Sequence, residues 1–241
     1  MIPKKIHYCW FGGKEKPKSV KKCIKSWKKF CPDYEVVEWN ETNFDMNFNA
    51  YVKEAYDSKK WAFVSDVARL YALVNFGGIY MDTDVELIKN PDNLLEYKAV
   101  SGFETDQHIM TGFIASEKGF PLFDELLHGY DGAHFIKEDG SPDLTPNVER
   151  MTKLCLENGL VLNDTFQIVN DFALFPHVYF SPKDHNDGKI YKTEDTVAIH
   201  HFAASWTSAR SKIRTKLVRI SYALLGHRIT DSIRRKFGNL K

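Results

Sequence analysis

The chain has 241 residues, of which 43% are hydrophobic and 14% aromatic, and its formal net charge is +1 at pH 7. This length and composition suffice for a sizeable core and exclude an intrinsically disordered protein. The cysteines form no C-x-x-C pair, which argues against a zinc knuckle or dithiol site, and without a signal peptide or a bilayer-spanning apolar run we expect a cytoplasmic protein.

The small net charge hides a partition along the chain. Residues 1–30 contain ten lysines and one acidic residue, and residues 209–241 contain ten basic residues and one acidic residue. Residues 31–208 contain thirteen basic and thirty acidic residues. We therefore predict an acidic globular domain over residues 1–208, whose start is basic, and a basic tail over residues 209–241.

The N-terminal segment predicts a strand followed by a helix. Ile6 to Trp10 form a short apolar run typical of a buried first strand. Gly12 and Gly13 follow and allow a backbone turn or a close approach to a ligand. Trp10 has two interpretations that stay open, a core side chain or a ring that stacks on a nucleobase. In the helix that follows, apolar residues face inward, and we interpret its lysine face as solvated surface.

Residues 61–84 are the most informative part of the sequence. Apolar residues recur every three or four positions from Trp61 to Val74 and predict a helix. Gly77 and Gly78 end it, and the residues after them favour a buried strand. Asp66 and Arg69 share one face of the helix, either as a structural ion pair or as a grip for phosphate and sugar hydroxyls.

Two aspartates come directly after that strand. Asp82 and Asp84 are two residues apart, so in an extended chain their carboxylates point to the same side. Such carboxylates repel each other unless a cation lies between them, and oxygen ligands suit Mg²⁺ or Mn²⁺. Asp-x-Asp alone is a weak motif match. With Asp66 and Arg69 nearby, it predicts a metal site for a diphosphate.

The second half of the chain predicts further elements and a histidine pair. Strands are expected over residues 100–103 and 111–115, a helix over 120–130, and a loop or lid over 139–147. His200 and His201 follow an apolar lead-in, and alternation along a strand lets only one of them face the site. A hydrogen-bonded histidine at a strand end is the default interpretation. Beside Asp-x-Asp, an imidazole ligand favours Mn²⁺ over Mg²⁺.

Four segments together resemble one glycosyltransferase family, in the expected order: residues 5–13, 65–71, 77–84 and 200–206. That family includes outer-chain mannosyltransferases and bacterial capsular polysaccharide sugar transferases, and it is distantly similar to large clostridial toxin catalytic domains. The resemblance implies an α/β fold of the GT-A type that binds a nucleotide sugar, with a mixed, mainly parallel central sheet flanked by helices. It does not cover the tail beyond Arg210.

The resemblance also implies roles for individual residues. Asp82, Asp66 and Arg69 are the expected catalytic residues. Metal ligands are expected at Asp84, His201 and Asp82, with His200 as the alternative to His201. Trp10 is expected to stack on the nucleobase, and Ser205 and Trp206 to approach the diphosphate. The full donor-binding set is Trp10, Ser65, Asp66, Arg69, Asp82, Ser205 and Trp206.

The expected activity is a metal-dependent retaining hexosyltransferase that uses Mn²⁺ or Mg²⁺. It would move a hexose from a UDP-hexose or GDP-mannose to a glycan or lipid-linked acceptor in surface polysaccharide synthesis. One alternative is a haloacid dehalogenase-like phosphohydrolase, which normally has Thr or Val where this chain has Glu86. The other is a non-catalytic nucleotide-sugar-binding subunit, which would keep Trp10 and the fold without turnover.

The tail contains two basic amphipathic stretches, around Ile213 to Leu224 and Ile229 to Phe237. Helices of this kind suit the headgroup region of an anionic membrane, which would make the protein peripheral on the inner membrane face. The alternative is a helix packed on the protein's own acidic body. Nucleic acid is not an expected partner because aromatic residues are not interleaved with these charges.

Overall fold

A computed structural model describes residues 1–184, 186–203, 217–218, 220–222, 224 and 230 of the chain. The chain divides into two compact units, Met1–Pro182 with Lys192–His201 and Lys183–Tyr191 with Phe202–Lys241. All elements named below belong to the first unit. None of the helices in the described ranges combines the length and the apolar character that crossing a bilayer requires.

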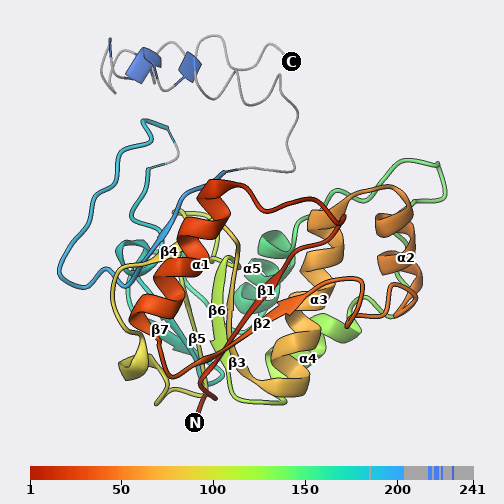
Figure 1. Cartoon of the computed structure of the whole chain (residues 1–241), viewed down its shortest axis with the longest axis horizontal. Coiled ribbons are helices and arrows are strands. Elements are labelled where there is room, and N and C mark those ends of the chain that lie inside the picture. The colour runs from red at the N-terminus through yellow and green to blue at the C-terminus, as the bar shows by residue number, and fades with distance from the viewer. Residues whose placement is uncertain (185, 204–216, 219, 223, 225–229, 231–241) are drawn as a thin grey trace. The chain divides into compact units, whose positions relative to one another are not determined.

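A seven-stranded sheet forms the centre of the first unit, in the order β2-β1-β3-β6-β5-β8-β7 (Figure 1). Five of its strands run in one direction, while β6 and β7 run in the other. The expected α/β class with a mixed, mainly parallel sheet is confirmed. The strands are β1 (Lys5–Cys9), β2 (Glu35–Trp39), β3 (Gly78–Met81), β5 (Ala99–Gly102), β6 (Phe113–Ser116), β7 (Gln167–Val169) and β8 (Phe172–Phe175).

A second, two-stranded sheet pairs β4 (Val85–Leu87) with β9 (Ala198–His200) in antiparallel register. Because β4 begins directly after Asp84, this pairing brings the histidine segment to the aspartates. Val85 lies opposite His200 and Glu86 opposite Ile199.

Helices flank the central sheet, as expected, and two clusters of buried side chains fill the spaces between the layers. One cluster joins the sheet to helices from the α2–α5 group, and the other joins its opposite face to α1 and the β4–β9 pair. The helices are α1 (Lys18–Phe30), α2 (Ala50–Asp57), α3 (Trp61–Phe76), α4 (Pro121–His128) and α5 (Asn147–Glu157), with short 3₁₀ turns at Asp92–Leu94 and His177–Tyr179.

The connection between α3 and β3 fits the predicted double-glycine stop. Gly77 has φ of 64° and Gly78 has φ of 108°, in the left-handed region that disfavours larger residues. A Cβ on Gly77 would lie 2.7 Å from the Lys118 backbone nitrogen. The turn therefore needs glycine for both conformation and space.

Two predicted boundaries differ from the structure near the site. The strand predicted over residues 111–115 begins only at Phe113. Before it, the Gly112 carbonyl accepts from the Asp82 N–H just past the end of β3, and the Thr111 carbonyl accepts from the Arg69 side chain. Asn147, predicted to end a loop, is the first residue of α5. Hydrogen bonds to α3 lie at both boundaries, from Arg69 to the Thr111 carbonyl and from the Asn147 N–H to Asp66.

We predict that Gly77→Ala destabilises the fold through the Lys118 contact. Gly119→Ala is the matched control, since Gly119 has φ of 71° but nothing lies within 4 Å of its added Cβ. Both variants are strained in backbone conformation, and only the first is overpacked. Chemical denaturation should give a loss of unfolding free energy that is about 1 to 3 kcal/mol larger for Gly77→Ala. Equal losses would contradict this account of the turn.

Candidate functional site

Asp82 and Asp84 lie in a tight turn between β3 and β4. The Asp82 N–H donates to the Gly112 carbonyl at 2.8 Å, and the Val85 N–H donates to the Asp82 carbonyl at 2.9 Å. One ligand atom from each of Asp82, Asp84 and His200 lies within 4.8 Å of the other two. The structure thus brings two carboxylates and one imidazole together at the carboxyl end of β3.

The two neighbouring histidines have different surroundings. The His200 Nε2 atom lies 3.4 Å from Asp84 Oδ1, and the His200 side chain is largely buried. The His201 Nε2 atom lies 2.8 Å from Glu86 Oε2, and Glu86 also forms an ion pair with Lys22. His200 is therefore the histidine that joins the two aspartates, while His201 faces a carboxylate outside that group.

Arg69 links the helix α3 to this turn. Its NH2 atom lies 3.0 Å from Asp66 Oδ1 and 3.3 Å from Asp82 Oδ1, and its NH1 donates to the Thr111 carbonyl at 2.8 Å. The guanidinium lies 4.7 Å from the centre of the Tyr80 ring. Arg69 is buried and holds carboxylates from two different elements.

The two oxygens of Asp82 have different neighbours. Oδ1 accepts a hydrogen bond of 2.9 Å from the Tyr80 hydroxyl and faces Arg69. Oδ2 faces Gly112 and His200: a Cβ on Gly112 would lie 3.1 Å from Asp82 Oδ2 and 3.2 Å from His200 Cε1. Tyr80 and Arg69 thereby hold Oδ1 in place, whereas Oδ2 lies on the side that faces His200.

Asp66 is held from a second direction by Asn147, the first residue of α5. The Asn147 N–H donates to Asp66 Oδ2 at 3.1 Å, and Asn147 Nδ2 donates to the Asp66 carbonyl at 3.2 Å. Burial raises the pKa of Asp66 to about 6, against the opposing effects of Arg69 and of the Asn147 N–H. Its carboxylate therefore depends on these two contacts to stay charged near neutral pH.

The cluster creates a negative potential that favours a cation. Burial lowers the pKa of His200, but Asp84, Glu104 and Asp82 outweigh that effect and raise the pKa to about 9. Burial also raises the pKa of Glu104, which lies near His200 and Asp82. In the absence of another cation, the site holds a proton on His200 at neutral pH.

Trp10 and Asp82 lie at the same end of the sheet. Each directly follows the carboxyl end of its strand, and the two strands, β1 and β3, are adjacent and parallel. The Trp10 ring is half-buried against core residues and its Nε1–H donates to the Lys14 carbonyl at 2.6 Å. A hollow of about 310 Å³ adjoins it, lined by Trp10, Gly13, Lys14, Lys16, Glu38, Asn40, Glu41 and Thr42. Both interpretations of Trp10 remain compatible with this position.

The remaining predicted residues are placed as follows. Ser65 lies on α3 and donates its hydroxyl to the Trp61 carbonyl at 3.0 Å. Ser205 and Trp206 lie outside the described residues. The sequence assigned no role to Tyr80, Thr111 or Gly112. Tyr80 had a readable signal, since it lies two residues before Asp82 on the same face of the strand, whereas the others act through backbone groups or long-range contacts.

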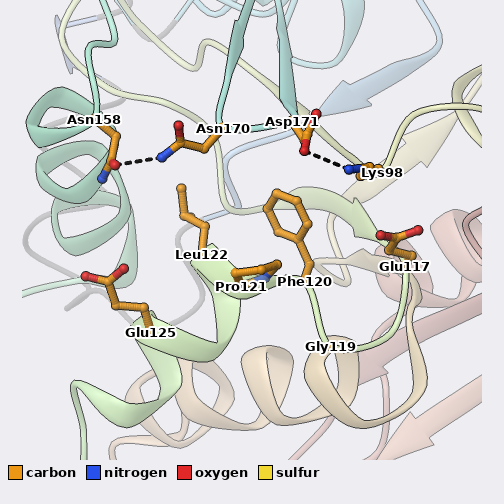
Figure 2. A pocket seen from close by; sticks show the side chains of 10 residues that line it. All are labelled: Lys98, Glu117, Gly119, Phe120, Pro121, Leu122, Glu125, Asn158, Asn170 and Asp171. Carbon is orange, nitrogen blue, oxygen red and sulfur yellow. Dashed lines mark hydrogen bonds and ion pairs between the residues drawn. The ribbon is translucent and has the colours of Figure 1, made fainter.

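A larger hollow, of about 520 Å³, lies at the other end of the strands, near the starts of β5 and β8 (Figure 2). Four of its polar side chains bind one another in pairs: Lys98 Nζ lies 2.8 Å from Asp171, and Asn170 donates to Asn158 at 2.7 Å. Its floor comes from residues at the start of α4, such as Phe120 and Pro121. Size alone does not make it a donor site, because it contains none of the predicted site residues.

Residues 17–101 match the family model described as "Glycosyltransferase sugar-binding region containing DXD motif". Residues 17–101 of the chain therefore belong to the DXD-containing glycosyltransferases. The expected family is thereby confirmed for the matched region. Asp82 and Asp84, which form the DXD motif of this glycosyltransferase, lie inside the matched region.

Several proteins resemble this glycosyltransferase. An uncharacterized glycosyltransferase of Acanthamoeba polyphaga mimivirus is 27% identical over 86% of this chain and 84% of that protein. Inositol phosphoceramide mannosyltransferase 3 of Schizosaccharomyces pombe is 30% identical over 52% of this chain and 36% of that protein. Among solved structures, the PaToxG glycosyltransferase has a TM-score of 0.47 and 18% identity, over 65% of this chain and 69% of that chain.

We predict an imidazole pKa of about 9 for His200 in the metal-free protein, against an ordinary value of 6.5. Asp84→Asn should lower this pKa towards 6.5, because it removes the nearest negative charge. NMR titration of the histidine ring nitrogens measures both values. Since the folded pKa is the higher one, the stabilising contribution of His200 is fully present below pH 6.5 and is lost as the pH rises through 9. A wild-type pKa at or below 6.5 would contradict the electrostatic account.

Proposed function

We propose that this glycosyltransferase is a metal-dependent, retaining hexosyltransferase that binds a divalent cation through Asp82, Asp84 and His200. The observation that carries the proposal is the meeting of these three side chains within 4.8 Å, beside a buried arginine. The sequence favoured His201 as the histidine ligand with His200 as its alternative, and the geometry favours His200.

The residues present fit a divalent cation in three respects. Two carboxylate oxygens and one imidazole nitrogen are suitable ligands, and the imidazole favours Mn²⁺ over Mg²⁺. The pKa of His200, raised by Asp84, Glu104 and Asp82 against the effect of burial, reports a potential that attracts positive charge. Gly112 leaves free the space that a side chain would take from Asp82 and His200.

The protein's own groups position the donor in this proposal. Arg69 and Tyr80 fix Asp82 Oδ1, so that the orientation of the carboxylate is set before any ligand arrives. Asp66, Arg69 and Asp82 form a connected row that orients the transferred hexose. A bound divalent cation would supply Lewis-acid neutralisation of the leaving diphosphate. The acceptor hydroxyl would attack from the face that the nucleotide leaves, which retains the anomeric configuration.

The nucleotide end of the donor fits the hollow beside Trp10, where the ring would stack on the base. Lys14 and Lys16 line that hollow, and the Lys16 Nζ lies 5.8 Å from the centre of the Trp10 ring. UDP-hexoses and GDP-mannose are both candidates for the donor. Ser65, Ser205 and Trp206 remain predicted contacts of the donor.

We propose a glycan or lipid-linked acceptor, in surface polysaccharide synthesis. The S. pombe relative is named for mannosyl transfer to inositol phosphoceramide, a lipid, which supports an acceptor with a lipid part. The basic tail, residues 209–241, would bind an anionic membrane and give peripheral attachment at its inner face. Of its described residues, Leu217, Ile220 and Leu224 are 61%, 44% and 78% exposed, which agrees with an apolar stripe on one side of a helix.

The first test is donor turnover. Incubation of the full chain with UDP-hexoses or GDP-mannose and Mn²⁺ should release nucleoside diphosphate slowly, through transfer of the sugar to water. We predict that Asp84→Ala abolishes release and its metal dependence, while Asp57→Asn, at an exposed position of α2, leaves both unchanged. Full activity in Asp84→Ala would remove the metal assignment. Binding of donor without any release, by a folded wild-type protein, would support the non-catalytic alternative.

The two histidines provide a matched pair of variants. We predict that His200→Ala weakens Mn²⁺ binding, measured calorimetrically in the presence of the nucleoside diphosphate, by about tenfold or more, because one of three protein ligands is lost. His201→Ala should change Mn²⁺ affinity by less than about threefold, since its ring contacts Glu86 instead. The reverse pattern would return the metal role to His201.

Trp10→Ala separates the two interpretations of that ring. If the ring stacks on the base, we predict that binding of the preferred nucleoside diphosphate weakens by roughly 1 to 3 kcal/mol. The variant should stay folded, and Trp10→Phe should recover most of the affinity. Loss of folding in Trp10→Ala, with unchanged nucleotide binding in Trp10→Phe, would assign the ring to the core.

A further inference from the structure

Helix α1 lies against one face of the central sheet (Figure 1), and its outward side is a continuous stripe of lysines. At about 100° per residue, the lysines fall within an arc of about 120° around the helix axis, and no acidic residue lies anywhere in the helix. The opposite side, with Val20, Cys23 and Trp27, is buried. The lysine stripe of α1 consists of Lys18, Lys21, Lys22, Lys25, Lys28 and Lys29, all of which are exposed.

The stripe is neutralised only in part by the described residues. Lys21 pairs with Glu15 at 2.5 Å and Lys22 pairs with Glu86 at 2.9 Å. The other four lysines of the stripe have no ion pair with a carboxylate in the described part of the chain. Lysines three or four residues apart on a helix repel each other. The folded protein therefore keeps repulsion between lysines that contact with an external anionic surface would reduce.

The form of the stripe favours a membrane over a nucleic acid. The helix is about 20 Å long and presents a convex row, whereas single-stranded nucleic acids are bound in grooves with aromatic rings for stacking. Its one tryptophan, Trp27, is fully buried. Lysines are flexible point charges without the fixed fork of arginine, which suits a diffuse layer of headgroups more than a defined phosphate.

The position of the stripe relates it to the candidate site. Helix α1 packs on β4, where the Trp27 Nε1–H donates to the Val85 carbonyl at 2.8 Å and the Leu87 N–H donates to Ser26 Oγ at 3.0 Å. Strand β4 begins directly after Asp84. A membrane in contact with the stripe would thus lie beside the strand that extends from the two aspartates.

We propose that the lysine stripe of α1 is an electrostatic contact surface for an anionic phospholipid membrane, independent of the C-terminal tail. Because the apolar side of α1 belongs to the core, the contact is made by charge alone without insertion of apolar side chains. Binding through the stripe is accordingly reversible and sensitive to salt.

The test uses the full chain and two variants that remove equal charge. In the stripe variant Lys18, Lys25, Lys28 and Lys29 are changed to Gln. In the control variant the exposed Lys59, Lys118, Lys137 and Lys153 are changed to Gln. Both variants keep the tail, so that a difference between them reports on α1. Sedimentation with vesicles of phosphatidylcholine, pure or mixed with phosphatidylglycerol, measures partitioning at about 0.1 M and about 0.5 M salt.

The stripe variant should partition onto the mixed vesicles at least about tenfold more weakly than the wild type, because each lysine near such a surface contributes about fivefold. The control variant should change by less than about threefold, and high salt should remove the difference. Donor hydrolysis without vesicles should be equal in both variants, which keeps this result separate from the proposed activity. Equal losses in the two variants, or no loss in the stripe variant, would overturn the proposal.

Two further measurements complete the test. If the stripe variant does not fold, acetylation of the wild type decides: mixed vesicles should protect the stripe lysines more than the four control lysines, and equal protection would refute the contact. A single-stranded oligonucleotide is the competing partner. Loss of oligonucleotide binding in the stripe variant, with vesicle binding unchanged, would assign the stripe to nucleic acid instead.

Discussion

The buried guanidinium of Arg69 is the interaction on which the candidate site depends. It lies 3.0 Å from Asp66 on its own helix and 3.3 Å from Asp82 at the end of β3, and it also binds the Thr111 carbonyl. A buried charge is tolerated only when it is paired and hydrogen-bonded. Arg69 therefore fixes where α3 meets the sheet and, through Asp82, how the DXD turn is oriented.

One arginine against several carboxylates leaves the site with excess negative charge. Asp66 and Asp82 both pair with Arg69, while Asp84 and Glu104 contribute further negative potential around His200. This imbalance opposes folding unless a cation resides there, as a proton on His200 or as a metal ion. The excess negative charge that destabilises the protein without a bound cation would thus also favour binding of a divalent cation.

Much of this arrangement was readable from the sequence, and the reasons are local. Helical spacing from Trp61, the double glycine at 77–78 and the two-residue period of a strand predicted α3, the turn, β3 and the common direction of Asp82 and Asp84. The choice between His200 and His201 was not readable, because it depends on the register of β9 against β4. The hydrogen bonds of Asn147 to Asp66 and of Arg69 to the Thr111 carbonyl join residues far apart in the chain, and neither leaves a pattern in sequence.

The central claim is that Asp82, Asp84 and His200 bind one divalent cation together with a nucleoside diphosphate. Pulsed electron paramagnetic resonance of Mn²⁺ bound to histidine-labelled protein with UDP or GDP tests it most directly. The account predicts hyperfine coupling to one imidazole nitrogen and to phosphorus, with the nitrogen coupling absent in His200→Asn. A manganese spectrum without imidazole nitrogen coupling, or without phosphorus coupling with either nucleotide, would contradict it.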